Sequence, residues 1–374
     1  MKTLAVICEY NPFHNGHKYQ LTHHKKELEA DSVICLMSGS FVQRGAPAIY
    51  DKWTRAQDAI ENGADLVIEL PVVYSAQSAQ RFASGAVKLL DKLGVVDFLS
   101  FGSECGDIDT LKKAAEIIDT FEFDLLIDDK LKTGISYPAA RTQVIKEHYP
   151  ELDETLISSP NNILALEYIN ALNKINSSIE PKTLLRNQSF ASASEIRSKI
   201  SSNESVSELV PTETRKTYDI SAYDNLILYH FRKERGKALQ KICDMAEGLE
   251  NKFKKASQFC TTYEQLADTV KSKRYTRTRI DRICVNSLLD IEDWHTELNP
   301  QYARVLAFNS RGQGLLAKMK KVSQIPIITK VADAAPYTEE FKIMFEKDLL
   351  ATDIYSILIH KPAGLDYKTS PTRL

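Results

Sequence analysis

Two histidines separated by two residues follow the first apolar segment, in the sequence EYNPFHNGHKYQL at residues 9–21. His14 and His17 stand where a strand is expected to end and a helix to begin, with Gly16 between them. Imidazole N–H groups donate hydrogen bonds to phosphate oxygens, a helix N-terminus favours anions, and a glycine lets the backbone approach a ligand closely. This spacing predicts a triphosphate site whose two imidazoles stabilise charge that develops at the α-phosphorus.

A histidine pair is also compatible with a metal site. However, the chain lacks His-Glu-x-x-His spacing and offers no evident third ligand, so we expect no metal ion held by the protein alone. His23 and His24 lie further along the same expected helix, where packed or solvated imidazoles are usual. Cys8 and Cys35 fall in apolar strands, which argues against a covalent acyl-enzyme.

Further polar residues follow the later strands. Residues 38–45, SGSFVQRG, are expected to form one wall of the pocket, and Arg44 with Lys52 and Arg55 to neutralise phosphate or contact RNA. The alternative for Lys52 and Arg55 is an ordinary solvated position on a helix. Gly102 ends the fourth expected strand, where it permits close contact with an adenine or ribose; a tight turn is the alternative.

Three later segments are candidates for the same pocket. Asn162 stands at an expected helix start, where an N-cap role alone explains its residue type. Arg186 and Asn187 end a short strand. Residues 192–197 place hydroxyls and an arginine at another helix start, an arrangement that suits β- and γ-phosphates.

The segment KSKRYTRTRIDR at residues 271–282 carries a local excess of positive charge. Its only acid is Asp281, and its basic residues are Lys271, Lys273, Arg274, Arg277, Arg279 and Arg282. With Tyr275 interleaved, it is predicted to bind a phosphate backbone and to stack on an unpaired base. A solvated basic helix is the alternative.

These candidate residues can act together only if strands and helices bring them to the same edge of a sheet. The expected strands, at residues 4–9, 33–37, 66–70 and 98–101, are almost continuously apolar and alternate with helical patterns at 17–29, 52–62 and 77–93. That alternation is typical of a Rossmann-like, doubly wound parallel sheet, whose ligands bind at the carboxyl ends of the strands.

After Gly102 the pattern becomes mainly helical. Helices are expected at 107–120, 137–148 and 161–174, then in 225–234, 243–256 and 278–289, with a small α/β element at 301–330. We therefore divide the chain into an α/β domain at 1–200, a linker at 201–219, and a mainly helical region at 220–374.

Composition limits the protein class. The 374 residues are 43% hydrophobic, and 48 basic against 50 acidic side chains leave a net charge of −2. A near-neutral chain gives no general reason for nucleic-acid or membrane binding, so any basic surface must be local. The six cysteines lack Cys-x-x-Cys spacing, and no apolar run reaches the length of a membrane span. We expect a cytoplasmic protein with reduced thiols.

The motifs together identify a family. His-x-Gly-His after the first strand resembles the nucleotidyltransferase superfamily. The longer strings EYNPFHNGH, MSGSFVQRGAPAIYDKWTRAQDAIENGADLVIELP, FGSE, SPNNILALEYI and KRYTRTRIDRI are similar to those of the tRNA(Met) cytidine acetate ligase family. This resemblance spans residues 1 to about 330. It implies that ATP activates acetate as acetyl-adenylate, and that the acetyl group passes to N4 of the wobble cytidine of elongator tRNA(Met).

The resemblance also implies that residues 1–200 form a nucleotidyltransferase-like, ATP-binding catalytic domain and that residues 220–374 bind tRNA. It further implies the roles of single residues. His14 and His17 would be catalytic, ATP would enter with Mg²⁺, and no membrane or DNA partner is expected. The nucleotide-binding set would be Ile7, Cys8, Glu9, Tyr10, Asn11, Pro12, Phe13, Asn15, Gly16, Lys18, Gly102, Asn162, Arg186 and Asn187. The RNA-binding set would be Lys273, Arg274, Tyr275, Arg277 and Arg279.

Two other functions remain open at this point. A small-molecule nucleotidyltransferase, transferring adenylyl or cytidylyl groups, would turn over a phosphorylated metabolite without RNA. A non-catalytic RNA-binding protein with a retained nucleotide pocket would bind tRNA but show no acetate-dependent pyrophosphate exchange.

Overall fold

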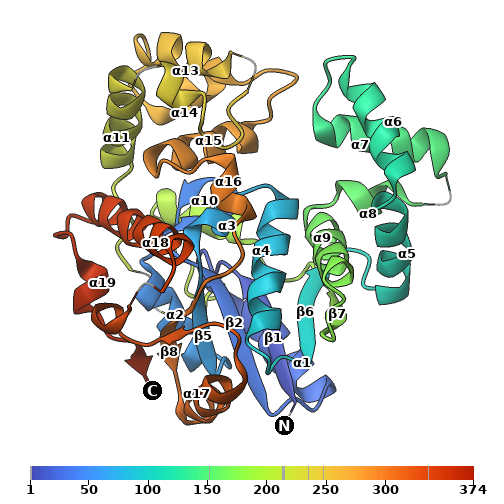
Figure 1. The fold of residues 1–374 in the computed structure, drawn as a ribbon, viewed down its shortest axis with the longest axis vertical. Coiled ribbons are helices and arrows are strands. Elements are labelled where there is room, and N and C mark those ends of the chain that lie inside the picture. Colours follow the sequence, from blue (N-terminus) through green and yellow to red (C-terminus); the bar gives the residue numbers. More distant parts are fainter. Residues whose placement is uncertain (1, 151, 213–214, 235, 247, 336) are drawn as a thin grey trace.

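An eight-stranded sheet forms the centre of the structure, a computed structural model that describes every residue except 1, 151, 213–214, 235, 247 and 336 (Figure 1). The strand order is β10-β8-β5-β2-β1-β6-β7, with β9 beside β8. The strands are β1 (Thr3–Cys8), β2 (Ser32–Ser38), β5 (Leu66–Leu70), β6 (Phe98–Ser103), β7 (Glu180–Leu185), β8 (Ala303–Phe308), β9 (Ile327–Ile328) and β10 (Thr372–Arg373).

The sheet is mostly parallel, which confirms the predicted fold class. Strands β5, β2, β1, β6 and β7 are parallel, and in chain order they read 3-2-1-4-5, as in Rossmann-like sheets. Strands β8, β9 and β10 run in the opposite direction, since β8 is antiparallel to β5 while β9 and β10 are parallel to β8. The strand order reverses between β1 and β6, so the ligand crevice of such a sheet is expected where these two strands end.

Both faces of the sheet are covered, because successive side chains of a strand point to opposite faces. On one face Ala5, Ile34 and Leu36 belong to the larger core, which includes residues of α4 (Ala79–Lys92) and α9 (Pro160–Lys174). On the other face Leu4 and Val33 join residues of α1 (Asn15–Glu27) and α2 (Lys52–Glu61). This double burial explains the apolar strand sequences.

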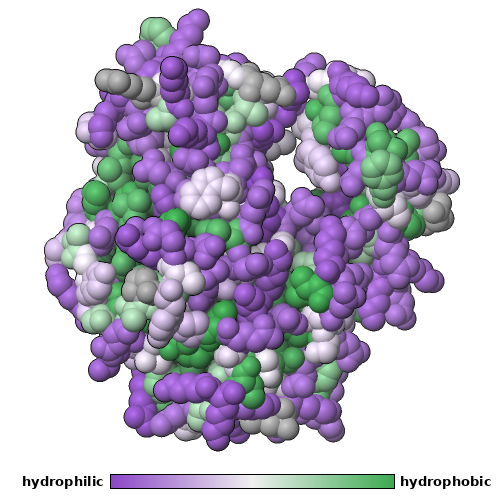
Figure 2. Space-filling model, in the orientation of Figure 1, coloured by the Kyte–Doolittle hydropathy of each residue, from purple (hydrophilic) through white to green (hydrophobic). Residues whose placement is uncertain are grey.

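Two groups of helices lie at the opposite end of the view from the N-terminus (Figure 1). One group consists of α5 (Ile108–Ile118), α6 (Phe121–Leu131), α7 (Tyr137–His148) and α8 (Glu154–Ser158). The other consists of α11 (Ile220–Lys233), α12 (Gly236–Leu239), α13 (Leu249–Ser257), α14 (Tyr263–Val270), α15 (Arg277–Leu288) and α16 (Asp293–Glu297). Figure 2 shows an open notch between the two groups.

Short elements complete the chain around these layers. A hairpin of β3 (Phe41–Val42) and β4 (Ala46–Pro47) follows β2. The others are α3 (Val72–Ser75), α10 (Ala193–Ser201), α17 (Ser310–Val322), η1 (Val331–Asp333), α18 (Glu339–Leu358) and α19 (Leu365–Lys368).

The last third of the chain returns to the central sheet. The small α/β element expected at 301–330 is not separate, because β8 pairs with β5 and β10 pairs with β8. A boundary at residue 220 therefore does not divide the sheet, although α11 to α16 do form a helical body. Residues 213–214 of the predicted linker, and residue 247 of the helix predicted at 243–256, lie outside the described residues.

Several predicted helix boundaries were wrong. The segment 77–93 begins as a helix only at Ala79, after the short α3. The segment 243–256 is helical only from Leu249, because Asp244 and Gly248 adopt left-handed backbone with φ of 66° and 80°. All six cysteines are free, as predicted. Among the described helices, none combines the length and apolar character of a membrane span.

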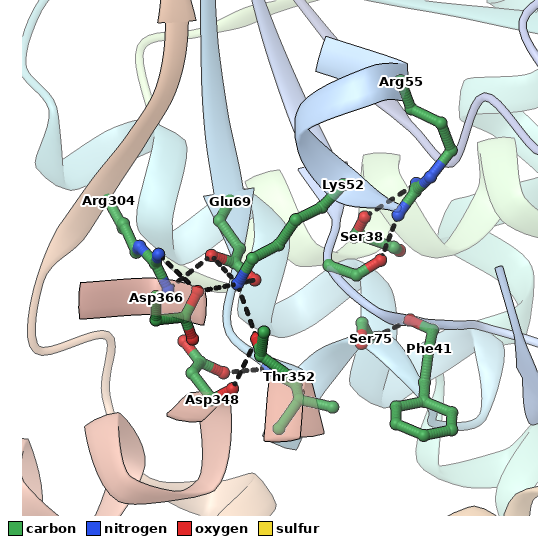
Figure 3. A network of polar contacts seen from close by, with 12 residues as sticks. Ser38, Phe41, Lys52, Arg55, Glu69, Ser75, Arg304, Asp348, Thr352 and Asp366 are labelled. Atoms are coloured by element: carbon green, nitrogen blue, oxygen red, sulfur yellow. Dashed lines mark hydrogen bonds and ion pairs between the residues drawn. The ribbon is translucent and has the colours of Figure 1, made fainter. Parts of the chain in front are cut away.

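A buried ionic cluster joins the C-terminal region to the sheet (Figure 3). The Lys52 Nζ atom lies 2.7 Å from Glu69 Oε1 and 2.9 Å from Asp366 Oδ1. Arg304 contacts the same two carboxylates, at 3.1 and 2.6 Å. Lys52 is only 1% exposed, so both predictions for it, phosphate or RNA contact and a solvated position, were wrong. Its charge serves to attach β8 and α19 to β5.

Candidate active site

A cavity of about 1380 Å³ opens at the carboxyl ends of β1 and β6, where the strand order reverses. Ligand pockets are typically 300–1,000 Å³, so this one has room for more than one small ligand. The predicted residues among its lining are Ile7, Cys8, Glu9, Tyr10, Asn11, His14, Gly16, His17, Gly102, Arg186, Asn187, Arg274 and Arg279. The tertiary structure therefore brings the histidine pair, the later strand ends and the basic segment into one space.

The two histidines form a stacked pair at the beginning of α1. Their ring centroids lie 3.6 Å apart, with 26° between the planes. His14 is the N-cap residue, and its Nδ1 accepts a hydrogen bond from the Gly16 backbone N–H at 3.1 Å. The His17 Nδ1 accepts from the His14 backbone N–H at 3.3 Å. This reciprocal cap fixes both rings against the helix terminus.

The cap also fixes the tautomers. A neutral imidazole carries one N–H, and an Nδ1 that accepts a backbone N–H leaves the proton on Nε2. Burial, with the nearby Arg186 cation, lowers the pKa of His14 to about 4. Burial and His14 lower the pKa of His17 well below its usual range. Both rings are therefore neutral near pH 7 and present Nε2–H donors.

The backbone at this helix terminus differs from the sequence-based expectation. Free N–H groups were predicted there, but the first three are already bonded. The Asn15 N–H donates to Leu209 O at 3.1 Å, and the His17 N–H donates to His14 O at 2.9 Å. The Gly16 N–H is bonded to the His14 ring. The imidazole Nε2–H groups, rather than the backbone, are thus the donors available to an anion.

Gly16 is required for the His14 position. A Cβ at residue 16 would lie 3.0 Å from Cε1 and 3.1 Å from Nδ1 of His14, tighter than ordinary contacts. Any larger residue would displace the ring that caps the helix. Gly16 therefore positions the imidazole, in addition to the close ligand approach predicted from the sequence.

Arg55 organises the loops behind the histidines. Its fully buried guanidinium donates to the carbonyl oxygen of Ser38 at 3.0 Å (Figure 3). It also donates to the carbonyl oxygens of Glu9, at 2.6 Å, and Gly39. Its Nε donates to Tyr50 O at 3.0 Å. Both predictions for Arg55, phosphate or RNA contact and a solvated position, were wrong. Instead it satisfies buried carbonyls at the ends of β1 and β2.

The β3–β4 hairpin is fixed to the histidine loop. The Glu9 carboxylate accepts the Gln43 backbone N–H at 2.7 Å, and burial raises the Glu9 pKa. The Gln43 side chain donates to Gln77 O at 2.7 Å. Arg44, the next residue, lines the cavity as expected from the sequence.

The end of β6 leaves space for a ligand. A Cβ at Gly102 would meet only Leu184 O, at 3.9 Å, so the protein itself does not exclude a side chain there. Gly102 lines the cavity and its φ is not in the left-handed region, which argues against the turn alternative.

Asn162 does not begin its helix. Ser159 is the N-cap of α9, and Asn162 is fully buried in the first turn. Its amide oxygen accepts from the backbone N–H groups of Glu104 and Cys105, at 2.9 and 3.1 Å. Its amide nitrogen donates to Thr155 O at 3.0 Å. The predicted N-cap role was wrong, because the residue instead holds the turn after β6.

Arg186 and Asn187 lie beside the histidines. Arg186 Nη1 lies 3.6 Å from the Glu104 carboxylate, and its side chain remains 44% exposed. Asn187 accepts the Ser189 backbone N–H at 2.9 Å. Ser192 is the N-cap of α10 and Arg197 donates to Asn11 O at 2.7 Å; both line the cavity.

The basic segment is divided between the cavity and structural roles. Arg274 and Arg279 line the cavity, together with Arg282. Arg277 contacts Glu264, Asp268 and Asp281 at 2.7, 3.2 and 2.6 Å.

Tyr275 is only 8% exposed, and the guanidinium groups of Arg274 and Arg279 lie 6.0 and 5.1 Å from its ring centroid. The predicted stacking face of Tyr275 is therefore covered. Lys273 is exposed and outside the lining.

Five of the predicted nucleotide contacts do not line the cavity: Pro12, Phe13, Asn15, Lys18 and Asn162. Phe13 is fully buried against the Tyr10 ring, and the Asn15 amide donates to Glu208 O at 2.8 Å. These two residues stabilise the loop between β1 and α1 on the side that faces away from the cavity.

The lining also contains residues that the sequence analysis missed, notably Tyr137, Arg141 and Glu167. One sequence signal could have identified them: Arg141 and Glu167 are charged residues on the apolar faces of the helices predicted at 137–148 and 161–174.

No group of three or more His, Cys, Asp or Glu side chains that could hold a metal ion occurs among the described residues. Mg²⁺ commonly binds through one or two carboxylates and substrate phosphates rather than in a full protein cage. A divalent ion at this cavity would therefore depend on the nucleotide for its ligands.

Comparison with known proteins gives a consistent result over the whole chain. Residues 1–369 match the HIGH Nucleotidyl Transferase family. A tRNA(Met) cytidine acetate ligase of Thermoanaerobacter sp. (strain X514) is 43% identical over 98% of both chains, and one of Acetivibrio thermocellus is 39% identical over 97% of this chain and 96% of that one. The crystal structure of Thermotoga maritima TmcAL bound with alpha-thio ATP superposes with a TM-score of 0.93, at 33% identity and full coverage of both chains.

Proposed function

The chain belongs to the HIGH nucleotidyl transferase family, among its tRNA(Met) cytidine acetate ligases, and we propose that its large cavity performs both steps of that ligation. The enzyme is an ATP-dependent ligase that acetylates a tRNA cytidine. We propose N4 of the wobble cytidine of elongator tRNA(Met) as the acceptor and acetate as the acyl donor, acting in the cytoplasm.

In the first step, acetate oxygen attacks the α-phosphorus of ATP and the bond to pyrophosphate breaks, giving acetyl-adenylate. The Nε2–H groups of His14 and His17 donate to the phosphate oxygens as negative charge builds up, and the exposed Arg186 adds positive charge beside them. Gly102 leaves room for the adenosine at the end of β6. When bound with the nucleotide, Mg²⁺ supplies further charge neutralisation to pyrophosphate.

In the second step, the cytidine N4 attacks the acetyl carbon and loses a proton to solvent, the bond between the acetyl carbon and the phosphate oxygen breaks, and AMP leaves. A cytosine amine is a weak nucleophile, so the adenylate is needed as an activated acyl donor. The chain's contribution is to hold the two substrates in one cavity.

One observation carries this proposal. The histidine pair of α1 and the arginines before and within α15 line the same cavity, although 260 residues separate His14 from Arg274. A site that binds only a nucleotide does not need these arginines. A cavity with both suits an adenylate that must meet a nucleic acid.

The test is acetate- and ATP-dependent labelling of a total tRNA pool, followed by nucleoside analysis. We expect labelled N4-acetylcytidine with the wild-type enzyme and a loss of about 10²-fold or more with His14→Ala. His23→Ala is the matched control, because His23 lies on the same helix but is 43% exposed and outside the cavity lining. Full activity of His14→Ala would remove the imidazoles from the mechanism. Turnover of a small phosphorylated metabolite without RNA would favour the nucleotidyltransferase alternative.

A further inference from the structure

A buried arginine in the cavity wall lacks hydrogen-bond partners. Arg141 lies on α7 with its side chain 5% exposed, and neither its Nε nor its Nη2 has a partner among the described residues. Its Nη1 lies 3.6 Å from Glu167 Oε1 of α9, within ion-pair range but beyond a hydrogen bond. Buried donors without acceptors are unfavourable and rare, which suggests that a ligand supplies the missing acceptors.

An aromatic ring stands beside this pair. Tyr137 lies four residues before Arg141 on α7, hence on the same face of the helix, and is 51% exposed. Tyr137, Arg141 and Glu167 all line the large cavity, together with Ile163 and Leu164 on the same side of α9. The wall thus combines an accessible ring, a donor group and an acceptor group.

The charges of the pair restrict the ligand. A phosphate or carboxylate that approached Arg141 would also meet the Glu167 carboxylate, and like charges repel. A neutral group with a donor next to acceptors suits both side chains. The Watson–Crick edge of cytosine has this pattern, since its N4 amine donates and its N3 and O2 accept, and unpaired bases are commonly held by aromatic stacking with hydrogen bonds to that edge.

We propose that Tyr137, Arg141 and Glu167 form the pocket for the acceptor cytosine, with the base stacked on Tyr137, its N3 and O2 bonded to Arg141, and its N4 amine bonded to Glu167. The assignment rests on the proposed function and extends it to the residues that choose the base. The ring of Tyr137 takes the role that the sequence analysis gave to Tyr275, whose face is covered.

The pocket discriminates cytosine from uracil. Uracil has a carbonyl oxygen where cytosine has its amine, so the Glu167 carboxylate would face another acceptor. The guanidinium must turn toward the base to bind it. Because no hydrogen bond from Nε or Nη2 to a described residue holds it in place, that rotation breaks none.

Adenine presents a similar edge, with an amine beside a ring nitrogen, so the experiment must separate the tRNA base from ATP. Acetate-dependent pyrophosphate exchange into ATP, measured without tRNA, reports on the adenylation step and on folding. Acetyl transfer to tRNA reports on both steps. The variants are Tyr137→Phe, Tyr137→Ala, Glu167→Gln and Arg141→Lys, with Tyr367→Ala as a control because Tyr367 is also 58% exposed but lies outside the cavity lining.

We expect pyrophosphate exchange close to wild type in all variants. The KM for tRNA should rise about tenfold or more in Tyr137→Ala, Glu167→Gln and Arg141→Lys, and stay near wild type in Tyr137→Phe and the control. Binding of an anticodon stem-loop should discriminate wobble cytidine from uridine in the wild type. That preference should be lost in Glu167→Gln, because a glutamine can also donate to the uracil oxygen.

Three results would overturn the assignment. Unchanged tRNA kinetics and unchanged base preference in Glu167→Gln and Tyr137→Ala would show that the pocket does not bind the base. A fall in exchange equal to the fall in transfer would assign the pocket to adenine or to folding. Absence of exchange and transfer in the wild type would instead refute the proposed function, and with it the reason for a cytosine pocket.

Discussion

Gly45 of the β3–β4 hairpin packs directly against the backbone of Arg282 in α15. A Cβ at residue 45 would overlap the backbone of Asp281 and Arg282, and Gly45 also has a φ of 81°, in the left-handed region. The same hairpin is bonded to Glu9 through Gln43. The nucleotide loop and the helical region are therefore joined at a contact that only glycine permits.

Gly45→Ala should destabilise the protein by about 1–3 kcal/mol, because it adds backbone strain and a clash at one position. Urea denaturation measures the change in the free energy of unfolding. Gly314→Ala is the control, because Gly314 lies inside α17 and an added Cβ would have no described atom within 4 Å. We expect this variant to be slightly more stable than the wild type, since alanine has the higher helix propensity. Equal stability of the two variants would contradict this account of the contact.

The rate of pyrophosphate exchange should not change near pH 6.5, the usual pKa of histidine. The pKa of His14 is lowered to about 4, so the ring is neutral above that value and protonates, losing its bond to Gly16, only below it. A pH–rate profile from about 3.5 to about 8 checks this. Arg186→Gln should move the acid limb to higher pH, because it removes the cation that opposes protonation. An acid limb near pH 6.5 in the wild-type profile would contradict the conclusion that His14 and His17 are neutral near pH 7.

Gly102→Ala should raise the KM for ATP without loss of stability. The added methyl has room in the free protein, where Leu184 O is its nearest neighbour at 3.9 Å, but it projects into the cavity. We expect the KM for ATP to rise about tenfold or more, and the melting temperature to stay within a few degrees of wild type. An unchanged KM for ATP would place the adenosine elsewhere.

Arg274 and Arg277 should behave differently although they are three residues apart. Arg274 lines the cavity, so Arg274→Ala should weaken tRNA binding and reduce the slope of log K against log salt by about 1. Arg277 is held by three carboxylates, so Arg277→Met should mainly lower stability. Filter binding at several salt concentrations and thermal melts separate the two effects. If Arg277→Met weakened tRNA binding and Arg274→Ala did not, the account would be contradicted, because Arg277 would then have to leave its carboxylates when RNA binds.

Asp348→Asn should gain stability relative to the wild type as the pH rises. Burial raises the pKa of Asp348 to about 7, while Val72 N–H and Tyr302 O–H donate to it at 2.7 and 2.5 Å. Between about pH 4 and 7 the folded state keeps a proton that the unfolded state has lost, so the wild type becomes less stable as pH increases. Paired urea titrations at several pH values should show the difference shifting by at least about 1 kcal/mol toward the variant. A difference independent of pH would show that Asp348 is ionised throughout.

The local features of this protein could be predicted from its sequence. Alternating apolar strands and amphipathic helices predicted the mostly parallel sheet, because a strand buried on both faces must be apolar throughout. His14, Gly16 and His17 were found from residue type and spacing alone. A parallel sheet binds its ligands at the carboxyl ends of the strands, so the edge of the sheet that carries the candidate site could also be predicted. The strand order, and with it the point where the order reverses, is known only from the structure.

Which charged and aromatic side chains face the cavity depends on the tertiary structure and not on local sequence patterns. Lys52 and Arg55 have the sequence of a solvated helix face, yet the return of α19 and the carbonyls at the strand ends enclose them. Tyr275 is covered, whereas Tyr137 is exposed beside Arg141 and Glu167. Periodicity describes one element at a time, but burial depends on what a distant segment places against it. Contacts between such segments therefore determine the chemistry of the cavity wall.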